Sequence, residues 1–169
     1  MSTTSSTAAR VWRVGADVDT DQIAPGHAMK HGIDVMATHC LEAVRPDFAA
    51  GVRPGDVLVA GPNFGIGSSR EQAASALVQL GVAAVIAPSF GGLYFRNAFN
   101  VGLLLLTCAD AEQLVEDERI AFDARAGRVV RADGRVLVTE AIPGFMLDMV
   151  EAGGLLAQLQ QRFFQRTPS

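Results

Sequence analysis

A glycine-rich segment at residues 61–73 (GPNFGIGSSREQA) lies between an apolar run and an amphipathic run, and it constrains the fold more than any other part of the chain. Residues 56–60 (DVLVA) predict a short buried strand, and residues 69–80 have the apolar spacing of a helix. A glycine-rich turn that opens a helix favours a bound anion, because free N–H groups and the positive helix end point to the same place. Arg70 adds a planar guanidinium suited to a carboxylate. The segment therefore predicts a site for a small acid, with two serines beside it.

Several known motifs built on glycines or serines do not fit this segment. A dinucleotide-binding fingerprint needs a third glycine where Arg70 stands, and a phosphate-binding P-loop needs a lysine that is absent. A serine-hydrolase elbow needs G-x-S-x-G and a later histidine, but no histidine follows His39. The segment alone leaves two interpretations open, an acid-binding site or a tight turn whose serines cap the next helix.

An acidic segment at residues 17–23 (DVDTDQI) has aspartates at alternate positions, as calcium-binding loops do. The EF-hand pattern fails because Gln22 stands where glycine is required, and no glutamate follows at the required place. The segment is then either a solvated acidic loop or the source of a catalytic carboxylate near the anion site.

The order of apolar and amphipathic runs predicts an α/β domain. Strands are expected at residues 11–14, 56–60, 82–87 and 103–106, and helices at residues 34–41, 69–80 and 93–99. Short runs at residues 120–123, 129–131 and 135–138 predict an antiparallel meander, and residues 142–164 predict a terminal helix broken at Gly153 and Gly154. The expected fold is a mixed, partly parallel sheet with an added antiparallel meander.

The length of 169 residues fits one domain with a sizeable core, which we expect to span residues 11–165. Residues 1–10 are rich in Ser, Thr and Ala and lack the basic start and apolar stretch of a signal peptide. They predict a disordered N-terminal leader.

Charge and hydropathy exclude several classes of partner. The formal net charge is -4 with no long basic run, so neither nucleic acid nor a membrane surface is an expected partner. The longest apolar runs are too short to span a bilayer. Cys40 and Cys108 form no C-x-x-C pair, and idle thiols of this kind fit a cytoplasmic chain.

Neither the cysteines nor the histidines predict a metal site. Two cysteines alone cannot hold a zinc ion or an iron–sulfur cluster, each of which usually needs three or four protein ligands. His27, His31 and His39 have spacings that could share one helix face, but a proline and two glycines interrupt a continuous helix there. We therefore expect no metal ion on this chain.

Five blocks taken together resemble the family of 3-isopropylmalate dehydratase small subunits, the swivelling domain of the aconitase superfamily. They are residues 19–23 (DTDQI), 61–73, 85–90 (VIAPSF), 97–104 and 151–155 (EAGGL), and the likeness runs from residue 11 to residue 162. The resemblance implies a swivelling β/β/α domain in a two-subunit hydro-lyase, closing over an active site held mainly by a large subunit. It also implies that the large subunit carries a [4Fe–4S] cluster on three cysteines. This chain alone is then expected to be inactive, and it could self-associate through the surface meant for its partner.

The resemblance also assigns roles to single residues. Ser68 matches the base that removes the proton from the carbon next to a carboxylate, while the iron acts as a Lewis acid on the leaving hydroxyl. Arg70 and Ser69 match residues that bind a substrate carboxylate. Asp21 matches an acidic residue that orients the base or its neighbours.

The substrate that the resemblance implies is 3-isopropylmalate, an intermediate of leucine biosynthesis. Leucine-pathway members often carry an Arg-Tyr-Leu-like segment where this chain has residues 26–30 (GHAMK). Ala28 and Met29 stand where Tyr-Leu is expected, and we expect them to contact the variable part of the substrate. Replacing a large aromatic residue with alanine removes a contact in the pocket. The loss of a contact of that size can shift discrimination between substrates by about 1–3 kcal/mol. Hydration of citraconate, maleate or dimethylmaleate, and a non-catalytic dicarboxylate-binding module, stay open as alternatives.

Overall fold

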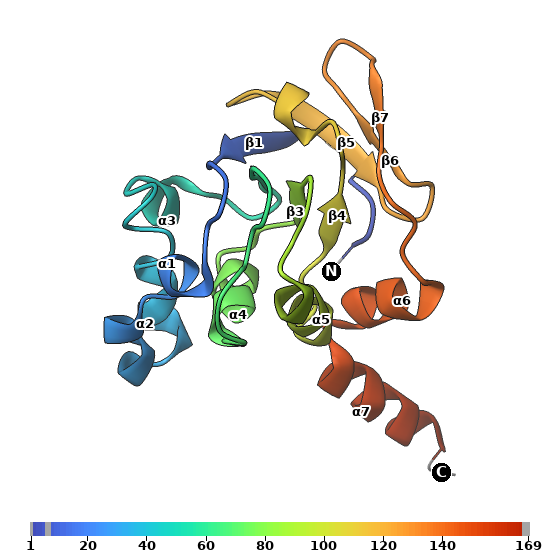
Figure 1. The fold of residues 1–169 in the computed structure, drawn as a ribbon. Helices are drawn as coiled ribbons and strands as arrows, with labels where there is room; N and C mark the ends of the chain where they lie inside the picture. The colour runs from blue at the N-terminus through green and yellow to red at the C-terminus, as the bar shows by residue number, and fades with distance from the viewer. Residues whose placement is uncertain (1, 6–7, 167–169) are drawn as a thin grey trace.

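The computed structural model describes residues 2–5 and 8–166 and contains one sheet in the strand order β4-β3-β2-β1-β5-β6-β7 (Figure 1). The parallel half consists of β1 (Ala9–Arg13), β2 (Val57–Val59), β3 (Ala84–Ala87) and β4 (Leu105–Thr107). Val11 lies opposite Val57, and Val57 lies opposite Ala84. All three side chains are buried.

An antiparallel meander continues the sheet beyond β1. It consists of β5 (Arg119–Asp123), β6 (Arg128–Val130) and β7 (Val136–Val138), with β5 paired to β1. Gly127 and Gly134 turn the chain between these strands with φ of 70° and 87°. The mixed sheet and the added meander are therefore confirmed.

The helices gather mainly below the sheet in the view of Figure 1, and α7 extends away from the body. Their bounds are α1 (Thr20–Ile23), α2 (Ile33–Thr38), α3 (Phe48–Gly51), α4 (Gln72–Gln79), α5 (Gly92–Asn100), α6 (Gly144–Ala152) and α7 (Leu155–Arg166), with 3-10 helices η1 (Gly26–His31) and η2 (Ala111–Gln113). Within residues 2–5 and 8–166, none of the helices combines the length and apolarity needed to cross a membrane.

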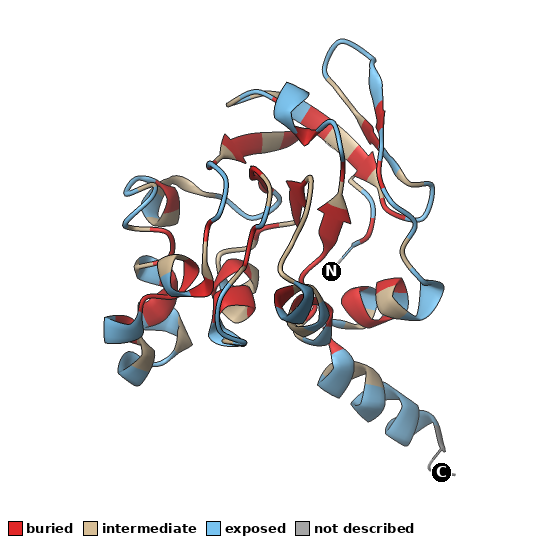
Figure 2. Cartoon of the chain, viewed as in Figure 1, coloured by how far each residue is buried: buried red, intermediate tan, exposed pale blue. Residues whose placement is uncertain are grey.

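The hydrophobic core fills the space between the sheet and the helices. Strands β2 and β3 are buried along their whole length, and α5 contributes Tyr94 and Phe99 (Figure 2). In contrast, α7 is mostly exposed, and its Phe163 and Phe164 side chains are 71% and 77% exposed. The buried strands therefore lie in the body of the domain, and α7 lies outside it.

The N-terminal boundary lies earlier than the sequence predicted. Ala9 and Arg10 belong to β1, and the buried Thr3 donates a hydrogen bond of 2.7 Å to Glu151. The domain therefore includes residues that were assigned to a disordered leader. Residues 1, 6 and 7 of that leader lie outside the described residues.

The predicted break in the terminal helix is confirmed. Gly153 and Gly154 separate α6 from α7 with φ of 94° and 116°. A Cβ atom at Gly154 would lie 2.6 Å from the Asn100 carbonyl oxygen, so a side chain there would collide with the end of α5. The glycine pair therefore allows the chain to pass close to α5.

Candidate active site

Three loops meet at the carboxyl edge of the parallel strands. Thr20 N donates a hydrogen bond of 2.9 Å to Ile66 O, which ties the loop after β1 to the loop after β2. Phe64 N donates to Ser89 O at 3.2 Å, which adds the loop after β3. Open α/β sheets bind ligands outside the carboxyl ends of their strands, so this edge is the place to look for a site.

Two glycines shape the loop after β2. Gly65 and Gly67 have φ of 81° and 101°, a region that favours glycine. A Cβ atom at Gly65 would lie 2.3 Å from the buried ring of Tyr94, and one at Gly67 would lie 3.5 Å from Thr20 Oγ1. This close approach brings the residue that follows, Ser68, against the loop after β1.

Ser68 is exposed, and its Oγ lies 3.2 Å from Oγ1 of the buried Thr20. Thr20 opens α1, where Asp19 and Gln22 form a reciprocal capping box that fixes the helix start. A threonine hydroxyl in this place can donate a hydrogen bond to a negatively charged Ser68 Oγ. The sequence analysis identified Ser68 but missed Thr20, although Thr20 lies inside the DTDQI block.

The predicted position of the serines at a helix mouth is wrong. Helix α4 begins at Gln72, so Ser68 and Ser69 lie in the loop before it. The N-cap residue of α4 is Glu71, which makes no side-chain capping bond. The Ser69 carbonyl instead accepts a hydrogen bond of 3.3 Å from Asn97 Nδ2. The helix start is three residues further on than predicted, so neither serine opens α4.

Arg70 and Asp21 form the charged part of the site. Arg70 Nη1 donates to Asp21 Oδ1 at 2.6 Å and to the Ala24 carbonyl at 3.2 Å. The hydrogen bond from Arg70, with a second from Gly26 N, holds the pKa of Asp21 below its usual range. Asp21 is largely exposed, so the pair adds little to stability. Its effect is to fix the direction of the Arg70 guanidinium.

The two residues predicted to contact the variable part of a substrate lie in η1. Ala28 is only 1% exposed and packs in the core, so the isolated chain does not present it to a ligand. Met29 is half-buried against the core, and its contact with substrate stays a prediction.

The cysteines do not fit an iron–sulfur cluster. Cys40 and Cys108 are both buried, and burial raises the pKa of Cys40 to about 12 and also raises that of Cys108. A cluster ligand has to be a thiolate, which such burial disfavours. Among the described residues, these two cysteines are therefore poorly suited to hold a cluster.

The fold and the site define a class of protein: an α/β domain that carries an exposed serine–arginine loop at the carboxyl edge of its parallel strands. The family described as the aconitase C-terminal domain matches residues 20–111, which contain this loop and Thr20. The chain belongs to that family, among its dehydratase small subunits.

Similar proteins cover nearly the whole chain. The methanogen homoaconitase small subunit of Methanothermobacter thermautotrophicus is 43% identical over 87% of this chain and 86% of that protein. The 3-isopropylmalate dehydratase small subunit of Halothermothrix orenii is 39% identical over 89% of this chain and 93% of that protein. A crystal structure of 3-isopropylmalate dehydratase from Methanocaldococcus jannaschii superposes with a TM-score of 0.87 at 35% identity, covering 94% of this chain and 95% of that one.

Proposed function

We propose that the chain is the small subunit of a two-subunit hydro-lyase that acts on 3-isopropylmalate, with a large subunit as its partner. The observation that carries the proposal is the exposed Ser68, which lies beside the Thr20 hydroxyl and two residues from the oriented Arg70. The names of several relatives support the choice of substrate. Because neither cysteine of this chain fits a cluster, we assign the [4Fe–4S] cluster to the large subunit.

Ser68 serves as the base in this proposal. Its Oγ takes the proton from the substrate carbon next to a carboxylate, and the electrons of that C–H bond form the new double bond while the C–O bond of the adjacent carbon breaks and its hydroxyl leaves. Serine is a weak base unless its alkoxide is stabilised. The hydroxyl of Thr20, 3.2 Å away, donates a hydrogen bond to that alkoxide, and the Arg70 charge lowers its energy further.

Arg70 binds the substrate carboxylate. The two hydrogen bonds that Arg70 donates to Asp21 and Ala24, among the described residues, both come from Nη1, so Nη2 can donate to an acid. Asp21 keeps the guanidinium in place through its 2.6 Å bond. Ser69, which is exposed in the same loop, adds a hydroxyl donor to the same carboxylate.

The exposure of the site supports a two-subunit arrangement. Ser68 and Ser69 are both exposed in the chain alone, where water weakens the attraction between Arg70 and an anion. A serine base also needs a site from which water is excluded. A partner that covers this edge would supply both conditions, and it would hold the groups that remove the hydroxyl.

A second substrate class has support from one relative. The homoaconitase small subunit is 43% identical to this chain, so homoaconitate hydration is the alternative reaction of the same site. The two substrates share the carboxylates that Arg70 and Ser69 would bind and differ in the side arm. The choice between them therefore depends on other residues, of which Met29 is our candidate.

The test is hydration by the complex of this chain with its large subunit, with the cluster reconstituted under anaerobic conditions. The panel contains isopropylmaleate, homoaconitate, citraconate, maleate and dimethylmaleate, and the readout is loss of the conjugated double bond. We expect isopropylmaleate to be turned over fastest, and only when both subunits are present. Dicarboxylate binding without any turnover by the complex would favour a non-catalytic module.

The serine assignment is tested by Ser68→Ala with Ser75→Ala as the control, since Ser75 lies on α4 outside the loop. Ser68→Ala should lower turnover at least about a hundredfold, the usual size of a general-base contribution. Ser75→Ala should leave turnover unchanged. Near-normal activity of Ser68→Ala would show that another group is the base.

A further inference from the structure

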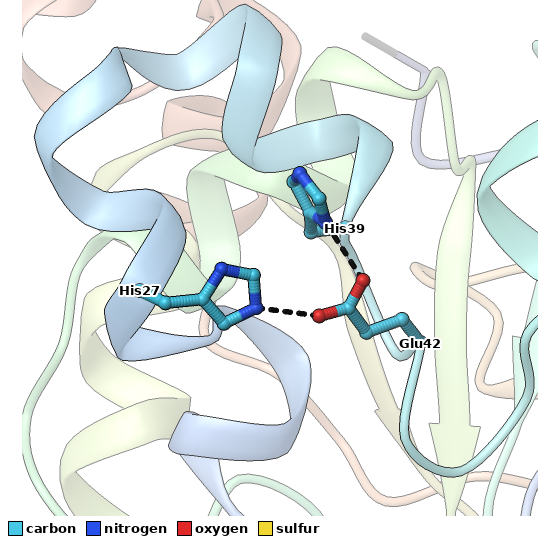
Figure 3. A group of neighbouring side chains, drawn as sticks. All are labelled: His27, His39 and Glu42. Carbon is cyan, nitrogen blue, oxygen red and sulfur yellow. Dashed lines mark hydrogen bonds and ion pairs between the residues drawn. The ribbon is translucent and has the colours of Figure 1, made fainter.

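Two histidines that are twelve residues apart meet at one carboxylate outside the proposed active site (Figure 3). His27 Nε2 lies 2.6 Å from Glu42 Oε1, and His39 Nδ1 lies 2.7 Å from Glu42 Oε2. The sequence predicted no metal site because the chain between the histidines cannot form one helix. The structure shows that they come together without one: His27 lies on η1, His39 follows α2, and Glu42 completes the group.

The backbone beneath the cluster is anchored in the core. Ala28, next to His27, and Leu41, next to Glu42, are both buried. Leu41 N donates to Ile23 O at 3.4 Å, and Glu42 N donates to His39 O at 3.1 Å. The three side chains therefore project from fixed backbone positions on two segments, which lowers the entropy lost when a ligand gathers them.

The donor set suits a zinc ion. Two imidazole nitrogens and one carboxylate oxygen are a common three-ligand zinc set, which leaves the fourth tetrahedral position to water. The ligand atoms lie within 4.8 Å of one another. A tetrahedral ion with bonds of about 2.0–2.1 Å places its ligands roughly 3.3 Å apart, so modest side-chain rotations would close the site.

In the metal-free chain, hydrogen bonds occupy the place of the ion. A carboxylate only accepts, so His27 Nε2 and His39 Nδ1 both carry protons while they bond to Glu42. A zinc ion would replace both protons between the rings and the carboxylate. Both oxygens of Glu42 already face the two rings, so either oxygen is placed to bind the ion.

We propose that His27, His39 and Glu42 bind one Zn²⁺ ion, which clamps η1 to the segment that follows α2. The clamp adjoins the proposed active site, because Gly26, the residue before His27, donates to Asp21 at 3.2 Å. The ion thus steadies the segment that carries Gly26 and Met29. The proposal stands on the geometry of the cluster and does not depend on the dehydratase activity.

The experiment titrates the metal-free full chain with Zn²⁺ by calorimetry and with Co²⁺ by visible absorption. We expect one ion per chain, a tetrahedral Co²⁺ spectrum without thiolate charge-transfer bands, and displacement of Co²⁺ by Zn²⁺. The thiolate bands separate this cluster from binding at Cys40 or Cys108. Because metal binding releases protons from its ligands, affinity should fall as the pH is lowered.

The variants are His27→Ala and Glu42→Gln, with His31→Ala as the matched control. His31 is an exposed histidine on the same η1 helix but is not part of the cluster. His27→Ala and Glu42→Gln should each weaken binding by more than the ten- to hundredfold that loss of a supporting partner costs. His31→Ala should bind as the unchanged chain does.

Three results would overturn the proposal: no saturable binding, equal affinity in all variants, or a loss in His31→Ala as large as in His27→Ala. The melting temperature of each metal-free variant checks that it is folded. Glu42→Gln keeps the shape of the side chain, so it tests the ligand role even where His27→Ala disturbs η1.

Discussion

The hydroxyl of Thr20, which is buried, lies 3.2 Å from the hydroxyl of Ser68, which is exposed. The contact links the first residue of α1 to the loop after β2. Because the capping box fixes the start of α1, the exposed serine has a hydrogen-bond partner whose position is set by the fold. Thr20 is therefore a positioning residue for the proposed base. Its role can be tested by substitutions that leave the loop after β2 unchanged.

Removal of the Thr20 hydroxyl should slow the reaction of the complex. Thr20→Val keeps the volume but loses a hydrogen bond worth about 0.5–1.5 kcal/mol, which corresponds to roughly a two- to twelvefold lower kcat. Since the alkoxide of Ser68 would be less stable, the activity should also require a higher pH. Both effects are measured from kcat and KM across a pH series.

Thr20→Ser is the matched control because it restores the hydroxyl. It should recover most of kcat and the original pH profile. A purely structural role for Thr20 would lower the melting temperature of Thr20→Val without moving the pH profile, and that result would contradict a positioning role.

The charge on Arg70 should be visible in the titration of Asp21. The folded-state pKa of Asp21 is lower than its ordinary value of 3.8, with the hydrogen bond from Arg70 as the largest cause. A lowered pKa means that the ion pair is intact at neutral pH and is lost only as the pH falls through that folded value. We expect Arg70→Gln to raise the pKa of Asp21 toward 3.8, as followed by carboxyl NMR. An unchanged pKa would mean that the two side chains do not pair in solution.

Apolar runs between turns predicted most of the fold. The strands at residues 82–87 and 120–123 were predicted from their apolar residues. The structure buries such residues in β3 and β5. The glycines at 153 and 154 marked the end of α6 because positive φ values there favour glycine. Boundaries were less accurate, because β1 begins at Ala9, where pairing with Ile120 extends the strand beyond its apolar stretch.

The site was predicted only in part, because its geometry depends on contacts between loops. Ser68, Ser69 and Arg70 were found from one segment, yet their distance from α4 depends on where the helix begins, which local pattern does not fix. The contact of Thr20 with Ser68 depends on how the loop after β1 lies against the loop after β2, which the sequence pattern does not show. Glu42 was missed in the same way, since one histidine partner lies on η1 and the other follows α2.

A side chain at Gly65 should disrupt both the fold and the site. Gly65→Ala would place a Cβ atom 2.3 Å from the Tyr94 ring at a residue with φ of 81°. We expect a loss of about 1–3 kcal/mol in the free energy of unfolding, together with lower activity, because the loop that holds Ser68 must move. Urea denaturation followed by circular dichroism measures the loss.

Gly92→Ala is the control for that substitution, since a Cβ atom at Gly92 would have no neighbour within 4 Å and the residue begins α5. It should leave stability unchanged or raise it slightly, because alanine favours a helix. Equal losses in the two variants would show that any added side chain is harmful, and the Tyr94 contact would not be the cause.

The buried hydrogen bond between Trp12 and Asp56 should make a large contribution to stability. Trp12 Nε1 donates to Asp56 Oδ2 at 2.9 Å, and the same oxygen accepts from Arg53 N at 2.9 Å. Asp56 is only 7% exposed, so Trp12→Phe leaves a buried carboxylate with one donor fewer and should cost about 1–3 kcal/mol. The cycle is completed by Asp56→Asn and the double variant, with unfolding followed by circular dichroism because Trp12 is the only tryptophan. Independent, additive losses would mean that the smaller ring, rather than the missing N–H donor, causes the effect of Trp12→Phe.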